Sequence, residues 1–139
     1  MTGPERSWGE DDRQEVTALY ARYTYAYDEG RPEELAALFT EDGAFEAAGA
    51  DPVRGTDALA RMVRAAALRP YGTRHLVSGV LVSGAGDAAS GTAYVVALRI
   101  GPGAVTPLAL GRYDDTFART ARGWRIRRRR FAPFLPPAP

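Results

Sequence analysis

His75 is the only histidine in this 139-residue sequence, and histidine is the side chain whose ordinary pKa lies nearest neutrality. The sequence has no cysteine, and all 18 basic residues are arginine, so thiolate chemistry, disulfides and lysine Schiff bases are excluded. A single histidine also excludes a multi-histidine metal site. Any catalysis would therefore use His75 with Asp, Glu, Tyr, Arg, Ser or Thr side chains, and we expect no cofactor and no metal.

A histidine serves as a general base most readily when a carboxylate holds one of its ring nitrogens. The carboxylate fixes the tautomer and stabilises the imidazolium that forms, and such a base is typically worth ~10²–10⁴-fold in rate. Asp28 is the carboxylate that we pair with His75, because it lies near the end of a predicted helix, at the edge of an aromatic surface. The alternative is that His75 is a buried core histidine and that Asp28 merely ends a helix.

Residues 10–30 predict an amphipathic helix whose buried face is rich in tyrosine. The apolar positions follow the i, i+3, i+4, i+7 spacing of one helical face and are Val16, Leu19, Tyr20, Tyr23 and Tyr27. Acidic residues crowd the start, where a helix dipole favours them, and Gly30 stands where a helix typically stops. Three phenolic hydroxyls therefore enter whatever this face covers, and buried hydroxyls normally need partners.

Two shorter helices are predicted next. Pro32 suits the first position of the second helix, which we expect to end at residues 40–43. A short strand at residues 44–47 follows it. Thr56 or Asp57 can cap the third helix.

Beyond Pro70 the apolar period changes from 3.6 to about 2. The strands predicted there are residues 73–83, 92–100, 108–118 and 124–131, and their short links predict an antiparallel meander. The fold class is therefore α+β: three N-terminal helices packed on a curved antiparallel sheet, cone-shaped with an internal pocket. We expect one domain over residues 1–139, with a polar lead-in at 1–9 and a proline-rich tail at 133–139.

Charge and composition argue against several partners. The 18 basic residues nearly cancel the 17 acidic ones, and no apolar run reaches membrane-spanning length, so we expect neither nucleic acid nor membrane as a partner. The N-terminus lacks a signal-peptide core, which favours a cytoplasmic location. The run Arg127–Arg130 invites a nucleic-acid interpretation, yet alternate residues of a strand face opposite sides. Asp114 and Asp115 fit structural acids opposite this strand.

Six short motifs carry a resemblance to a known family. They are Tyr23-x-x-x-Tyr27-Asp28-x-Gly30, Leu35-x-x-Leu38-Phe39-x-x-Asp42-Gly43, Gly55-x-x-Ala58-Leu59, Arg74-His75, Gly111-Arg112-Tyr113-x-Asp115 and Gly123-Trp124-Arg125-Ile126-x-x-Arg129. In this order, over roughly residues 12–131, the sequence resembles a SnoaL-like domain of the nuclear-transport-factor-2-like superfamily. The pattern is most similar to the group of scytalone dehydratase, bile-acid dehydratase and hexachlorocyclohexane dehydrochlorinase.

The resemblance implies catalytic roles for individual residues. Enzymes of this group keep an acidic residue at the end of the first helix and a histidine on the first long strand, and Asp28 and His75 match those positions. They also place a proton-donating or charged residue about one turn before the aspartate, where Tyr23 stands.

An arginine of the last strand completes the implied set. Arg129 matches it best, with Arg128 and Arg130 as close competitors. The pocket-lining residues that we expect are Tyr20, Tyr27, Phe39, Phe45, Met62, Val63, Tyr94, Tyr113 and Phe131.

Two functions from different classes follow. One is a cofactor-independent lyase or isomerase, dehydratase- or cyclase-like, that abstracts a proton from a hydrophobic cyclic or polyketide-like small molecule. The other is a non-catalytic pocket protein that binds a small ligand or dimerises. We also expect a homodimer or homotrimer packed through the sheet. The apolar residues that suggest it, because they lie on more than one strand face, are Leu110, Tyr113, Phe117, Trp124 and Ile126.

Overall fold

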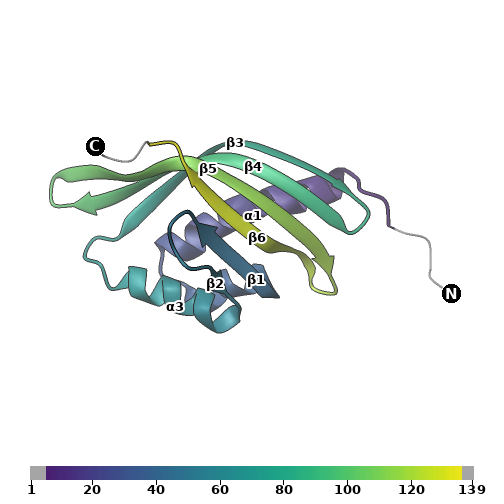
Figure 1. Cartoon of the computed structure of the whole chain (residues 1–139), viewed down its shortest axis with the longest axis horizontal. Helices are drawn as coiled ribbons and strands as arrows, with labels where there is room; N and C mark the ends of the chain where they lie inside the picture. Colours follow the sequence, from purple (N-terminus) through teal and green to yellow (C-terminus); the bar gives the residue numbers. More distant parts are fainter. Residues whose placement is uncertain (1–5, 136–139) are drawn as a thin grey trace.

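The computed structural model describes residues 6–135 and contains, within them, three helices and one six-stranded sheet (Figure 1). The helices are α1 (Glu10–Asp28), α2 (Pro32–Ala37) and α3 (Thr56–Ala67). The strands are β1 (Phe39–Ala47), β2 (Val53–Arg54), β3 (Thr73–Ala85), β4 (Ala88–Gly101), β5 (Ala104–Thr120) and β6 (Gly123–Pro133). Their order in the sheet is β2-β1-β6-β5-β4-β3. The predicted α+β class with three helices is confirmed. None of the helices in this described part has the length and apolar character needed to cross a membrane.

The sheet is mixed, so the prediction of a purely antiparallel sheet is wrong at one strand pair. β3, β4, β5 and β6 form the predicted antiparallel meander. β1 instead runs parallel to β6, with Phe45 beside Arg129. Because β1 reaches the other strands only through the α3 crossover, no tight turn fixes its direction. β1 also begins at Phe39, inside the predicted second helix, and the two-residue β2 was not predicted.

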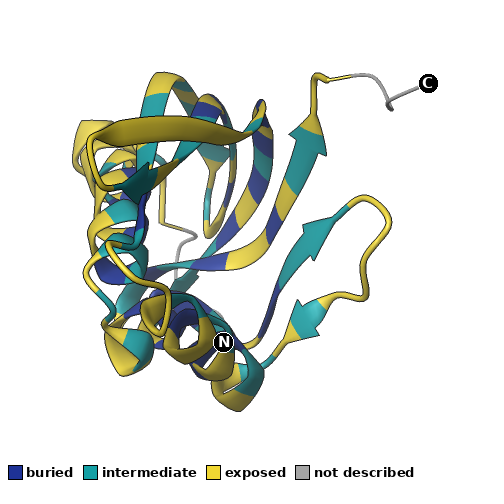
Figure 2. Ribbon diagram, turned by 90° about the vertical axis from the view of Figure 1, so that its left-hand side faces the viewer, coloured by how far each residue is buried: buried dark blue, intermediate teal, exposed yellow. Residues whose placement is uncertain are grey.

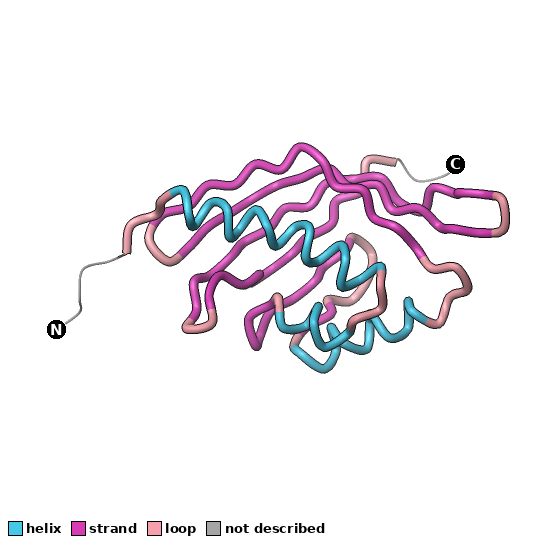
Figure 3. Tube along the Cα trace, turned by 180° about the vertical axis from the view of Figure 1, so that it is seen from behind, coloured by secondary structure: helices cyan, strands magenta, loops and turns pink. Residues whose placement is uncertain are grey.

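Helix α1 lies along the sheet (Figure 3), and it buries the face that its apolar spacing predicts. The side chains of this face that are at most 2% exposed are Val16, Leu19, Tyr20 and Tyr23. Tyr27, one turn further on, is only partly buried. Gly30 follows the helix with a φ of 67°, and a Cβ there would lie 3.2 Å from the Cβ of Ala67. The left-handed backbone and the close approach to α3 both favour glycine at this turn.

Side chains of the long strands alternate between the helix-covered face and the outer face, which gives the banded ribbons of Figure 2. In β5, Tyr113, Asp115 and Phe117 are turned to the covered face and are buried. In β4 the same face receives Ala93 and Val95. The core therefore lies between these inward residues and the buried stripe of α1.

A bulge in β6 changes which arginine reaches the core. Phe117 of β5 pairs with Ile126, but the residue just before Phe117 pairs with Arg128. Arg127 is therefore an extra residue on β6, and the inward–outward alternation restarts after it. As a result Arg129, rather than Arg128, is directed to the covered face, where it is fully buried.

The outer face of the sheet keeps exposed apolar side chains. Leu76 is 57% exposed, and the Tyr94 ring lies against Phe134 with their centroids 5.6 Å apart. Leu110 is exposed on this face too. The other four residues that suggested a second apolar face are all buried in the core: Tyr113, Phe117, Trp124 and Ile126.

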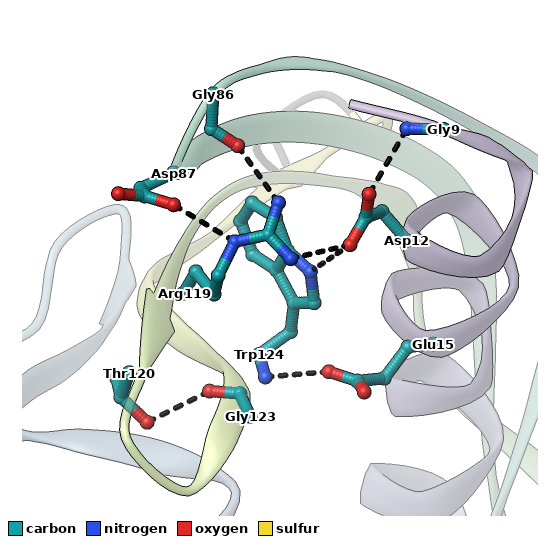
Figure 4. Close-up of polar contacts among 9 residues, drawn as sticks. All are labelled: Gly9, Asp12, Glu15, Gly86, Asp87, Arg119, Thr120, Gly123 and Trp124. Carbon is teal, nitrogen blue, oxygen red and sulfur yellow. Dashed lines mark hydrogen bonds and ion pairs between the residues drawn. The ribbon is translucent and has the colours of Figure 1, made fainter. Parts of the chain in front are cut away.

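One carboxylate ties the first turn of α1 to the strands (Figure 4). Asp12 accepts hydrogen bonds from the Gly9 amide at 2.9 Å and from the Trp124 indole Nε1 at 3.0 Å. It also accepts one from Arg119 Nη1 at 2.6 Å, and Arg119 in turn donates to Asp87 at 2.8 Å. The hydrogen bond from Arg119, followed by those from Trp124 and Gly9, lowers the pKa of Asp12 from 3.8 to about 2.

We predict that Asp12→Asn lowers the melting temperature near neutral pH more than Asp11→Asn, which removes the same charge from the same helix end. Because the folded-state pKa of Asp12 is depressed, its stabilising contribution is fully present above the unfolded value of 3.8 and is lost as the pH falls toward 2. Between about pH 4 and about pH 2 the wild type should therefore lose more stability than the Asp12→Asn variant. Thermal melts followed by circular dichroism measure this, and parallel pH curves for the two proteins would contradict it.

Candidate functional site

Asp28, the last residue of α1, holds both the side chain and the backbone of His75 on β3. Asp28 Oδ1 lies 2.6 Å from His75 Nδ1, and Asp28 Oδ2 accepts a 2.8 Å hydrogen bond from the His75 amide. The side chains of Asp28 and His75 are 6% and 12% exposed, respectively. The two residues that the sequence analysis paired are thus in direct contact across the helix–sheet interface.

This contact assigns the tautomer of the His75 ring. An ionised carboxylate accepts but does not donate, so the proton between the two groups belongs to Nδ1 and the neutral ring keeps a lone pair on Nε2. The same carboxylate stabilises the imidazolium that forms when Nε2 takes up a proton. A histidine held in this way is able to act as a general base. In residues 6–135, no three His, Cys, Asp or Glu side chains are grouped to hold a metal ion.

His75 lies in the wall of a cavity of about 120 Å³ between the helices and the sheet. The lining residues are Tyr23, Tyr27, Phe45, Met62, His75, Val95, Ala97, Ala109, Tyr113 and Phe131. The Tyr27 ring stands edge-on to the His75 ring, with centroids 4.8 Å apart and planes at 70°. The cavity is therefore small and largely aromatic, with one imidazole in its wall.

The tyrosines of the wall stay protonated across the neutral range. Burial raises the pKa of Tyr23 well above its ordinary value of 10.0, and burial also raises the pKa of Tyr27. The pKa of Tyr113 rises to about 12, because burial outweighs the opposing charge of Arg129. These phenols are suited to donating hydrogen bonds to a ligand oxygen rather than to removing protons.

The residues assigned to a pocket wall from the sequence divide into two groups. Those that line this cavity are Tyr27, Phe45, Met62, Tyr113 and Phe131, and Tyr23 joins them. Those that pack in the core without lining the cavity are Tyr20, Phe39 and Val63.

Tyr94 is a correction, since it is 56% exposed on the outer face of the sheet. Its neighbours Ala93 and Val95 are turned inward, so strand alternation turns Tyr94 outward. The wall residues that the sequence analysis missed are Val95, Ala97 and Ala109. The alternation of β4 places Val95 and Ala97 on the inward face, so these two could have been predicted. Small side chains are less obvious candidates for a pocket wall than aromatic ones.

Arg129 lies in the core and does not line the cavity, contrary to the expectation that it faces a ligand. Its Nε and Nη2 donate to the two carboxylate oxygens of Asp115 at 3.0 and 3.1 Å. Its guanidinium carbon lies 3.8 Å from the ring centroid of Tyr113 and 4.3 Å from that of Tyr23. Burial alone would lower the pKa of Arg129, but Asp115 more than offsets this and the pKa is raised. A charged Arg129 therefore supports two wall residues from behind.

The other candidate arginines are at the surface. Arg128 is paired with Glu46 at 2.7 Å, and Arg130 is exposed. Asp115 is a structural acid opposite the arginine-rich strand, as expected, because it pairs with Arg129 in the sheet register.

A larger open cleft of about 820 Å³ lies between α2, α3 and the β5–β6 turn. Four arginines and three carboxylates line it, with neither Asp28 nor His75 among them. We place the candidate site at the smaller cavity, because the histidine and its carboxylate are found there.

We predict that Asp115→Asn destabilises the fold by about 3–5 kcal/mol, because it leaves the Arg129 charge buried without its partner. The double variant Asp115→Leu with Arg129→Met removes both charges and should regain most of that loss. Asp114→Asn is the matched control: its exposed pair with Arg112 is worth at most about 1 kcal/mol. Denaturant unfolding measures all three variants. If Asp115→Asn and Asp114→Asn lost the same free energy of unfolding, the structural role of the buried Asp115–Arg129 pair would be contradicted.

Comparison with known proteins extends over nearly the whole chain. The family model for the SnoaL-like domain matches residues 10–130. An NTF2-like protein with a cystatin-like fold from Novosphingobium aromaticivorans is 30% identical, with a TM-score of 0.83 over 92% of this chain and 85% of that chain. The function-unknown protein Rv3472 from Mycobacterium tuberculosis is 34% identical, with a TM-score of 0.80 over 90% and 76%.

A third solved structure, a candidate scytalone dehydratase from Novosphingobium aromaticivorans, is 25% identical, with a TM-score of 0.78 over 90% of this chain and 85% of that chain. No curated protein matches the sequence. The family match and the shared fold confirm the resemblance inferred from the six motifs. The chain therefore belongs to the SnoaL-like domain family and has its NTF2-like fold.

Proposed function

We propose that the protein is a cofactor-independent lyase or isomerase, dehydratase- or cyclase-like, in which His75 abstracts a proton and Asp28 orients it. One observation carries the proposal: Asp28 contacts both the ring and the backbone amide of His75, in the wall of an aromatic cavity. A carboxylate-bound imidazole beside a nonpolar hollow supplies what a proton transfer needs. We take this hollow as the internal pocket expected from the sequence, and a hydrophobic cyclic or polyketide-like molecule as its ligand.

The proposed reaction starts at a carbon next to a carbonyl group. His75 Nε2 takes a proton from that carbon, and the carbonyl oxygen becomes an enolate oxygen that accepts hydrogen bonds from Tyr23 or Tyr113. In a dehydration, the imidazolium returns the proton to the leaving hydroxyl, the carbon–oxygen bond breaks and water departs. In an isomerisation, the proton returns to a different carbon. Asp28 stays ionised throughout.

The similar proteins support the class of reaction only. One solved structure, 25% identical to this chain, is a candidate scytalone dehydratase. The non-catalytic alternative, a pocket protein that binds a small ligand, would use the same cavity. In that alternative, Asp28 would not need to fix the tautomer of His75.

We predict that His75→Ala and Asp28→Asn lower the rate of proton removal by about 10²–10⁴-fold. The reaction to follow is exchange of the hydrogens next to the carbonyl of a bound cyclic ketone for deuterium in heavy water, measured by proton NMR. Asp28→Asn leaves the ten lining residues in place, so ketone binding should persist while exchange falls.

Two control variants change residues outside the cavity and leave its charge and volume as they are. Leu76→Ala truncates the next residue of β3, which faces outward, and Asp11→Asn removes a carboxylate from the far end of α1. Both should exchange at the wild-type rate. The ligand-binding alternative replaces catalysis in either of two cases. In the first, the wild type binds ketones but does not exchange their hydrogens for deuterium. In the second, Asp28→Asn exchanges them at the wild-type rate.

The partners and the location expected from the sequence stay predictions. A homodimer or homotrimer would cover Leu76, Tyr94 and Leu110 on the outer face, and the mass measured by light scattering tests it. The absence of nucleic-acid and membrane partners also stays a prediction. The cytoplasmic location is likewise a prediction.

A further inference from the structure

Resting on the proposed proton abstraction, we propose that the substrate is an uncharged, single-ring carbonyl compound, and that the cross-strand pair Ala97–Ala109 sets this size limit.

The floor of the cavity consists of small residues on β4 and β5. Ala97 pairs directly with Ala109, and both line the cavity. The next inward position of β5 is Gly111, where a Cβ would lie 2.6 Å from the Phe131 ring. The missing side chain at Gly111 therefore lets the Phe131 ring close over the strand and form a wall. The hollow lies beside three small inward residues, Ala97 on β4 and Ala109 and Gly111 on β5.

The volume of the cavity limits the ligand to one ring. A nonpolar protein cavity of roughly 150 Å³ holds a benzene molecule, whereas pockets for drug-sized ligands measure roughly 300–1,000 Å³. At about 120 Å³ this half-open cavity is much closer in size to the first kind of site than to the second, which favours one six-membered ring over two fused rings. A larger side chain at Ala97 or Ala109 would occupy the remaining space.

The charges around the cavity favour an uncharged ligand. No arginine or carboxylate is among the lining residues. An anion would lose its hydration with no arginine among the lining residues to pair with, and it would approach Asp28 behind the His75 ring. A cation would meet the charge of Arg129 behind the rings of Tyr23 and Tyr113. A neutral molecule avoids both costs.

The wall also provides hydrogen-bond donors for one ligand oxygen. Tyr23, Tyr27 and Tyr113 line the cavity, and each carries a hydroxyl that can donate one hydrogen bond. A carbonyl oxygen can accept from them, which leaves an adjacent ring carbon for His75 Nε2. A single ring with one carbonyl group can therefore use His75 together with one or two of the wall tyrosines.

The test compares the binding of three ketones by isothermal titration calorimetry. Cyclohexanone has one ring, 2-decalone has two fused rings, and 3-oxocyclohexanecarboxylate adds a negative charge to one ring. We expect cyclohexanone to bind at least about 10-fold more tightly than either of the others, the discrimination that a nonpolar pocket achieves against one or more extra methylenes. Equal or tighter binding of 2-decalone or of the carboxylate would overturn the inference.

Variants of the floor and wall test the residues that set the limit. Ala109→Val should weaken cyclohexanone binding about 10-fold, while Ala104→Val, an exposed alanine of the same strand, should not change it. Phe131→Ala enlarges the cavity and should raise the affinity for 2-decalone, which keeps the inference testable if Ala109→Val does not fold. An unchanged preference in folded Ala109→Val and Phe131→Ala proteins would overturn it.

The same titrations in Asp28→Asn separate this inference from the proposed function. If Asp28→Asn keeps the preference for a small, uncharged ketone but loses deuterium exchange, the result supports both the size limit and the proposed function. Wild-type exchange with no size preference overturns the size limit alone. Size preference with no exchange in the wild type overturns the proposed function and leaves a single-ring binding site.

Discussion

The carboxylate of Asp28 joins the end of α1 to the edge of the sheet. β3 is the last strand of the sheet, so N–H groups on its outer edge have no strand partner. Asp28 accepts the hydrogen bond from the amide of His75 and also contacts Nδ1 of the His75 ring. Hydrogen bonds to an ionised group are stronger than neutral ones. One interaction therefore joins the end of the helix to the sheet and orients the imidazole in the cavity wall.

Behind two tyrosines of the cavity wall, an ion pair is buried in the core. Arg129 and Asp115 are enclosed by three tyrosines, and one guanidinium nitrogen of Arg129 has no hydrogen-bond partner within the described residues. A buried pair of this kind is seldom the most stable solution, since apolar residues of similar volume often serve as well. Its position behind the rings of Tyr23 and Tyr113 gives it a structural role in the wall, and the charge of Arg129 opposes the effect of burial on the pKa of both phenols.

Local patterns in the sequence were enough to predict most of the elements, and long-range geometry explains what they missed. The spacing of Val16 to Tyr23 predicted the buried face of α1, and the single histidine with a helix-end carboxylate led to the pair that the structure brings together. The direction of β1 was not predictable, because a crossover connection carries no turn chemistry. The bulge at Arg127 moves an arginine from one face to the other without any glycine or proline to mark it.

The tautomer of the single histidine is the most direct test of the claim that Asp28 prepares His75 to accept a proton at Nε2. Nitrogen-15 NMR of protein labelled at histidine reports the two ring nitrogens of one residue, with no assignment needed. In the neutral ring, the wild type should carry its proton on Nδ1, and Asp28→Asn should shift the population toward the Nε2–H form. A wild-type ring protonated on Nε2, or an equal mixture that Asp28→Asn does not change, would contradict the account.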